Sequence, residues 1–146
     1  MVILSEMNTG NLSRAAKKVK SAVKRWLIEL KNVELQEYEE EYSQLSLLYN
    51  EFEQIDLEHM TYEALERFDT MKRALLTFLA KIVIENPGRF FTVEGTMEKI
   101  TVAYDIKAVI FSVSWTDAAG DHILQFEVAE QGGIYDFIDV IKKNKH

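Results

Sequence analysis

Hydrophobic positions recur with a helical period through the first third of the chain. One apolar stripe steps by four and three residues through Leu12, Ala16, Val19, Val23, Trp26, Leu30 and Val33. This spacing is typical of one face of an α-helix. A second stripe follows at Leu35, Tyr38, Tyr42, Leu45, Tyr49 and Phe52. Continuing the first stripe past Val33 would bury Glu37, so the repeat changes phase near "KNVEL".

This change of phase leaves two interpretations of residues 12–55. One long helix can absorb a four-residue insertion in its repeat. Alternatively, Asn32 ends a first helix and an antiparallel helical hairpin begins. Because "KNVEL" contains no glycine or proline that would force a turn, we favour the long helix.

A third helix is predicted after residue 60. Thr61 can cap its first turn, and Glu63 and Glu66 suit the positive end of the helix dipole. Its apolar face would contain Leu65, Phe68, Met71, Leu75, Phe78, Leu79 and Ile82. The "NPG" sequence at residues 86–88 should end it, because proline cannot continue a helix.

Beyond Pro87 the pattern changes to short β-branched and aromatic runs: "RFFTVEG", "KITVAYD", "IKAVIFSVSW" and "HILQFEVAE". The last two flank "TDAAGD", a loop suited to a hairpin, and Gly95 is expected to supply a turn. One face of this hairpin should hold Val109, Phe111, Val113 and Trp115, opposed by Leu124, Phe126 and Val128. The end of the chain predicts a closing helix that buries Ile134, Phe137, Ile138 and Ile141.

This order of elements predicts an α+β fold. It comprises an N-terminal long helix or helical hairpin, a third helix, an antiparallel sheet of three or four strands, and a C-terminal helix. A chain of 146 residues, 47% of them hydrophobic, suits one core. We therefore expect a single domain over 1–146, with a helical part at 12–85 and the sheet and closing helix at 89–146.

Charge is segregated along the helical part. The net charge is −7, yet residues 14–31 carry seven bases against Glu29, and residues 34–69 carry twelve acids against Arg67. The basic helix face comprises Arg14, Lys17, Lys18, Lys24 and Arg25. The acidic face comprises Glu37, Glu40, Glu41 and Glu51. At 100° per residue the glutamates of "EYEEEY" spread around a helix, so they predict a solvated or ion-paired surface and not a cation site.

Signatures of catalysis and cofactor binding are missing from the sequence. There is no cysteine, the six glycines form no phosphate-binding motif, and the histidines at 59, 122 and 146 are not spaced as metal ligands. We therefore expect no cofactor, no metal site and no catalytic residue. One enzymatic alternative is a metal-dependent hydrolase or nuclease built on Asp105, Lys107, Asp117 and Asp121, because "DIK" resembles the acidic-x-lysine element of such nucleases.

The segregated charge and the missing chemistry predict a non-enzymatic interaction protein. It would bind or inhibit a macromolecular partner with a basic surface, for example as a blocker of a nucleic-acid-binding protein, and it would form a homodimer. The alternative is nucleic-acid binding through the basic helix at 14–31. No run of about 18 apolar residues and no secretory signal is present, so we expect a cytoplasmic protein without a membrane span.

Overall fold

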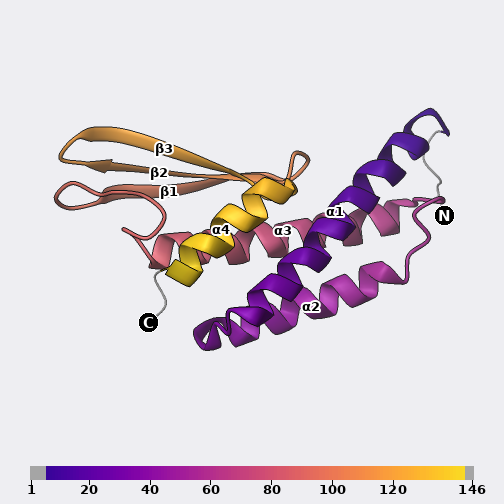
Figure 1. The fold of residues 1–146 in the computed structure, drawn as a ribbon. Helices are drawn as coiled ribbons and strands as arrows, with labels where there is room; N and C mark the ends of the chain where they lie inside the picture. Colours follow the sequence, from indigo (N-terminus) through magenta and orange to yellow (C-terminus); the bar gives the residue numbers. More distant parts are fainter. Residues whose placement is uncertain (1–5, 144–146) are drawn as a thin grey trace. The chain divides into compact units, whose positions relative to one another are not determined.

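A computed structural model describes the backbone of residues 6–143 and the side chains of residues 14–143. The side chains of Leu12 and His146 therefore lie outside the described residues. The elements follow the predicted order, helices first and then a sheet and a last helix, which confirms the α+β fold (Figure 1). They are α1 (Glu6–Asn32), the 3₁₀ turn η1 (Gln36–Tyr38), α2 (Glu39–Glu53), α3 (Tyr62–Glu85), β1 (Glu98–Asp105), β2 (Ile110–Asp117), β3 (Gly120–Glu127) and α4 (Gln131–Lys143).

The chain divides into two compact units, one up to Leu75 and the other from Leu76 onward. The boundary falls inside α3, so this helix contributes its first half to the helical unit and its second half to the sheet unit. The single domain over 1–146 stays a prediction.

In the helical unit, α1 and α2 form an antiparallel hairpin and lie side by side (Figure 1). The preference for one long helix over residues 12–55 was therefore wrong. The chain leaves α1 through Glu34, which adopts a φ of 51°, a left-handed conformation that glycine usually supplies. Val33 and Tyr38 are buried on either side of this turn. The Tyr42 hydroxyl then donates to the carbonyl oxygen of Leu27 at 3.1 Å and so joins the two helices.

The core of the helical unit follows the predicted stripes. Every described residue of the first stripe, from Ala16 to Val33, is buried. In the second, Leu35 and Tyr42 are half-buried and the others are buried. Phe52 of α2 stacks on Phe68 of α3 with ring centroids 5.3 Å apart. The capping role of Thr61 is confirmed, because the backbone N–H of Ala64 donates to its hydroxyl oxygen at 3.1 Å.

In the sheet unit, β1, β2 and β3 pair antiparallel in sequence order. Phe111 lies opposite Phe126 with the rings stacked at 4.7 Å, and Val113 lies opposite Leu124, which confirms the predicted shared face. The predicted buried positions of α4 are confirmed as well. Phe137 of this helix meets Phe126 edge to face at 6.1 Å, so α4 packs on the apolar face of the sheet.

The first β-rich run, residues 89–95, forms no strand, so the sheet in the described part of the chain has three strands. Its aromatic residues contribute to the core in another way. Phe90 packs on Phe137 at 4.6 Å, and Phe91 stacks on Trp115 at 4.2 Å. Gly95 follows with a φ of 73°, as expected of a turn. The segment is thus held by side-chain packing, which β propensity cannot distinguish from strand pairing.

Candidate functional site

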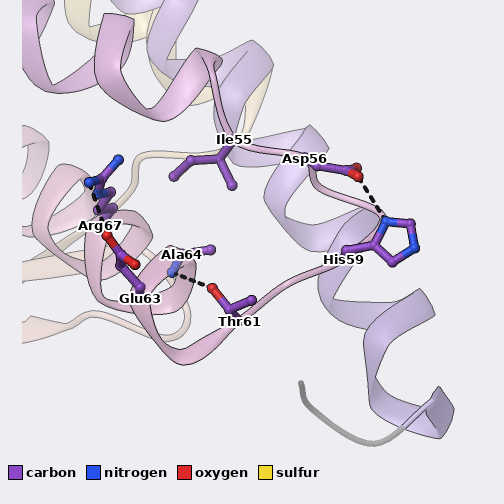
Figure 2. A pocket seen from close by; sticks show the side chains of 7 residues that line it. All are labelled: Ile55, Asp56, His59, Thr61, Glu63, Ala64 and Arg67. Carbon is purple, nitrogen blue, oxygen red and sulfur yellow. Dashed lines mark hydrogen bonds and ion pairs between the residues drawn. The ribbon is translucent and has the colours of Figure 1, made fainter. Parts of the chain in front are cut away.

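A pair of adjoining hollows on the helical unit is lined by carboxylates from three segments: one from α2, one from the loop after it and two from the start of α3. One hollow, of about 300 Å³, is lined by Leu48, Glu51, Glu63, Glu66, Arg67 and Thr70. The other, of about 240 Å³, is lined by Ile55, Asp56, His59, Thr61, Glu63, Ala64 and Arg67 (Figure 2). Because both share Glu63 and Arg67, we treat them as one surface and call it the acidic groove.

Helix geometry accounts for this gathering of charge. On α2, Leu45, Tyr49 and Phe52 are buried, so Glu51 falls on the exposed side of the helix. On α3, the burial of Ala64 and Phe68 leaves Glu63, Glu66 and Arg67 exposed. The packing of Phe52 on Phe68 holds the two helices together, and the groove lies between their outer faces.

The groove carries more negative than positive charge. Glu51, Asp56, Glu63 and Glu66 supply four carboxylates, whereas Arg67 supplies the permanent cation. The Nη2 atom of Arg67 lies 3.1 Å from Oε1 of Glu63, and both side chains are more than half exposed (Figure 2). Such an exposed pair is readily exchanged for another partner. An incoming cation would therefore meet several carboxylates.

Asp56 and His59 form the outer end of the groove. The Nδ1 atom of His59 lies 2.8 Å from Oδ2 of Asp56 (Figure 2). The backbone N–H of Glu58 donates to Oδ1 of Asp56 at 2.9 Å. The hydrogen bond with His59, followed by that from Glu58, lowers the pKa of Asp56. Asp56 therefore remains ionised at neutral pH and fixes one negative charge at this end.

The groove also has apolar walls. Leu48 and Ile55 are half-buried and Ala64 is buried along its lining. Lysine and arginine side chains combine an aliphatic stem with a cationic head, so they bury the stem on apolar surface while the head stays near carboxylates. The lining thus offers both kinds of contact that a basic side chain can use.

The predicted acidic face is only partly assembled in this groove. Glu51 lines it, and Glu40 lies eleven residues earlier, nearly in line with Glu51 along α2. Glu37 belongs to the preceding turn η1, and Glu41 is half-buried. Among the described residues, no group of three or more histidines, aspartates or glutamates is arranged to hold a metal ion.

The predicted basic face lies along α1 and its five side chains are exposed. Lys17 nevertheless has an acidic partner, because its Nζ atom lies 2.7 Å from Oε1 of Glu58 in the loop after α2. Arg25 approaches Glu29 of the same helix at 3.9 Å. The hairpin thus brings the oppositely charged blocks side by side, and the Lys17–Glu58 pair joins them.

The alternative hydrolase residues are not brought together. Asp105 ends β1 and Asp117 ends β2. Because the two strands are antiparallel, these residues lie at opposite ends of the sheet along the strand direction. Eight-residue strands span roughly 25 Å. Asp105 instead accepts the backbone N–H of Ala108 at 3.0 Å within the β1–β2 turn, a typical turn role for aspartate.

Asp117 likewise holds a turn together. Its carboxylate accepts the N–H of Ala119 at 2.8 Å and that of Glu94 at 3.1 Å, and Nε2 of His122 lies 2.8 Å away. Burial raises the pKa of Asp117, but the hydrogen bonds from Glu94, His122 and Ala119 and the charge of His122 outweigh it and lower the pKa to about 2. Asp121 is engaged separately by the Thr116 hydroxyl at 2.7 Å.

Sequence reasoning missed most of the groove. It interpreted Glu63 and Glu66 as charges at a helix start and gave no site role to Asp56, Arg67 or Leu48. The available signal was the acidic excess over residues 34–69, which shows how much charge is present but not which carboxylates converge.

Comparison with protein-family models, curated proteins and solved structures gives no match to this chain. None of the helices in the described part of the chain is long and apolar enough to cross a membrane.

Proposed function

We propose that this protein is a non-enzymatic interaction module that binds or inhibits a macromolecular partner through the charged faces of its helical unit. The acidic groove is the central contact and receives lysine or arginine side chains from a basic surface. The observation that carries the proposal is that Glu51, Asp56, Glu63 and Glu66 line two adjoining hollows with apolar walls. Opposite charge would speed encounter, and burial of the aliphatic stems would add affinity.

A nucleic-acid-binding protein is one concrete partner. Such proteins present clustered cationic side chains for phosphates. Carboxylates on the helical unit could bind these cationic side chains in place of phosphates. The partner would then be unable to bind nucleic acid. We further propose that the protein acts as a homodimer in the cytoplasm.

The exposed basic face of α1 supports a second candidate, direct nucleic-acid binding. Neutralising several phosphates would make the affinity fall steeply with salt. The net charge of −7 opposes the approach of a polyanion, so this candidate ranks second.

Affinity purification of the tagged chain from its native cell, with and without nuclease, separates the two candidates. Our proposal predicts a basic protein that is retained after nuclease treatment and lost with the Glu51→Lys/Glu66→Lys variant. A matched control is Asp136→Lys/Asp139→Lys, which changes the net charge equally at exposed positions of α4. This control should retain the partner.

The opposite pattern would favour nucleic acid. In that case nuclease would remove the bound material, and Lys17→Glu/Lys24→Glu would abolish its recovery while the groove variant would not. Equal loss of the partner with the groove variant and the α4 control would contradict specific use of the groove, because it would show that only net charge matters.

A further inference from the structure

Strand β1 is exposed along nearly its whole length. Of its eight residues only Val102 is half-buried, and the other seven are exposed. They include two large hydrophobic side chains, Ile100 at 41% and Tyr104 at 45% relative exposure. Because the strand order is β1-β2-β3, β1 is an edge strand of this sheet. An edge strand presents unpaired backbone N–H and C=O groups to any strand that approaches it.

The apolar residues of β1 continue the buried face of the sheet. Val102 lies opposite Val113 and Tyr104 opposite Phe111, and both partners are buried. Directly paired residues of an antiparallel ladder point to the same side. The apolar face that is covered at β2 therefore extends onto β1, where the described residues leave Ile100 and Tyr104 partly exposed.

We propose that β1 pairs antiparallel with β1 of a second copy of this chain. The two three-stranded sheets then join into one of six strands. This inference rests on the homodimer of the proposed function and assigns a surface to it. The pairing is centred on Val102, which faces Val102 of the second copy. Ile100 then lies opposite Tyr104 of the second copy, and Lys99 lies opposite its Asp105.

This register allows backbone hydrogen bonds between the two strands and also sets compatible side chains opposite each other. A shift by one residue would set the apolar face of one copy against the polar face of the other. The centred register instead matches apolar with apolar side chains, and by symmetry it makes the Lys99 to Asp105 charge pair twice. Lys99 has a φ of 53° at a bulge where the pairing with β2 shifts. Regular pairing with β2 begins at Thr101. In the proposed dimer the long Lys99 side chain reaches its partner from the bulge.

At the other edge of the sheet, the register of β3 centred on Leu124 does not have this complementarity. If β3 paired with itself about Leu124, Asp121 would face Glu127 of the second copy, and this like-charge pair would also occur twice. Like charges directly opposite each other are destabilising in antiparallel pairs. Of these two centred registers, charge therefore favours the one at β1.

Sedimentation velocity of the isolated full-length chain over a wide concentration range tests the register. Lys99→Asp alone and Asp105→Lys alone should each raise the dimer dissociation constant on the order of tenfold, because each turns two attractive pairs into repulsive ones. An equimolar mixture of the two variants should regain wild-type association, since every facing pair is again of opposite charge. A monomeric wild type, or a mixture that associates no better than either variant, would overturn the proposal.

Asp105→Lys also removes the hydrogen bond from Ala108 in the β1–β2 turn, so a second comparison uses variants that leave Asp105 unchanged. Ile100→Lys should abolish association, whereas Ile123→Lys, the same change at a side chain of β3 with 71% exposure, should leave it intact. Circular dichroism establishes that both variants are folded. Equal loss of association in both would refute β1 as the interface. The groove variant Glu51→Lys/Glu66→Lys should dimerise normally although it loses the partner. A monomeric wild type would therefore contradict the β1 interface, whereas a groove variant that keeps the partner would contradict the proposed function.

Discussion

The two units expose different chemistry on their outer surfaces. In the helical hairpin the side chains that face away from the core are largely charged, basic on α1 and acidic on α2. In the sheet, β1 leaves Ile100 and Tyr104 exposed beside an open backbone edge. A helix satisfies its own backbone, so its outer face can specialise in charge, whereas an edge strand still needs partners for its backbone. This difference is the basis for proposing charged partners for the helical unit and strand pairing for the sheet unit.

The largest expected effects on stability come from removing one buried ring from the core of each unit. Phe52→Ala in the helical unit and Phe111→Ala in the sheet unit each remove a fully buried ring and should lower the free energy of unfolding by about 3–5 kcal/mol. Urea denaturation measures this loss. Leu47→Ala, at a side chain of α2 with 60% exposure, should change stability by less than about 0.5 kcal/mol.

The two tryptophans extend this experiment to the question of cooperativity. Trp26 reports on the helical unit and Trp115 on the sheet unit, so Trp→Phe at one leaves a reporter for the other. The predicted single domain requires Phe52→Ala to shift both fluorescence transitions together. A shift confined to Trp26 would show that the units unfold independently and would contradict the single domain.

A smaller effect is expected at the start of α3. Thr61→Ala removes the acceptor for the Ala64 N–H and should cost about 1 kcal/mol of stability. Thr77→Ala, at an exposed position of the same helix, should leave stability unchanged or slightly higher because alanine favours helix. Equal effects in thermal unfolding would refute the capping role.

The sheet unit should show a distinctive acid sensitivity through Asp117. Its pKa is about 2 in the folded protein, below the ordinary value of 3.8, so in acid the unfolded chain binds the proton first. The stability from this carboxylate is complete above about pH 4 and is lost as the pH falls toward 2. Asp117→Asn should lack this part of the pH dependence, so denaturation curves of the two proteins should converge in acid. Parallel profiles would contradict the assignment.

The smallest effect is expected for the exposed pair that links the oppositely charged blocks. Lys17→Ala removes the contact with Glu58 and should change stability by less than about 0.5 kcal/mol, because both side chains are well solvated. The residual effect should shrink further at high salt. A loss above about 1 kcal/mol in urea denaturation would mean that the basic face of α1 serves to stabilise the hairpin.

Much of the fold could be predicted from periodicity alone. The helical stripe from Ala16 to Val33, the cap at Thr61, the β2–β3 hairpin and the buried face of α4 each depend on local spacing or on one residue with a specific conformational role. These signals are physical properties of neighbouring residues, so one sequence is enough to reveal them.

The errors arose where distant residues decide the outcome. The turn after α1 uses Glu34 with positive φ, where sequence offers no glycine, and burial of Val33 and Tyr38 holds it. The run at 89–95 has strand composition, but Phe90 and Phe91 pack on the sheet face. The acidic groove needs α2 and α3 to lie together, and charge counting along the chain cannot supply that arrangement.

Titration calorimetry with the basic protein recovered by affinity purification tests the central claim most directly. The account predicts that wild-type protein and Asp136→Lys/Asp139→Lys bind it with similar affinity, and that Glu51→Lys/Glu66→Lys loses at least about tenfold, which corresponds to about 1.4 kcal/mol. Unchanged affinity of the Glu51→Lys/Glu66→Lys variant would contradict recognition through the acidic groove.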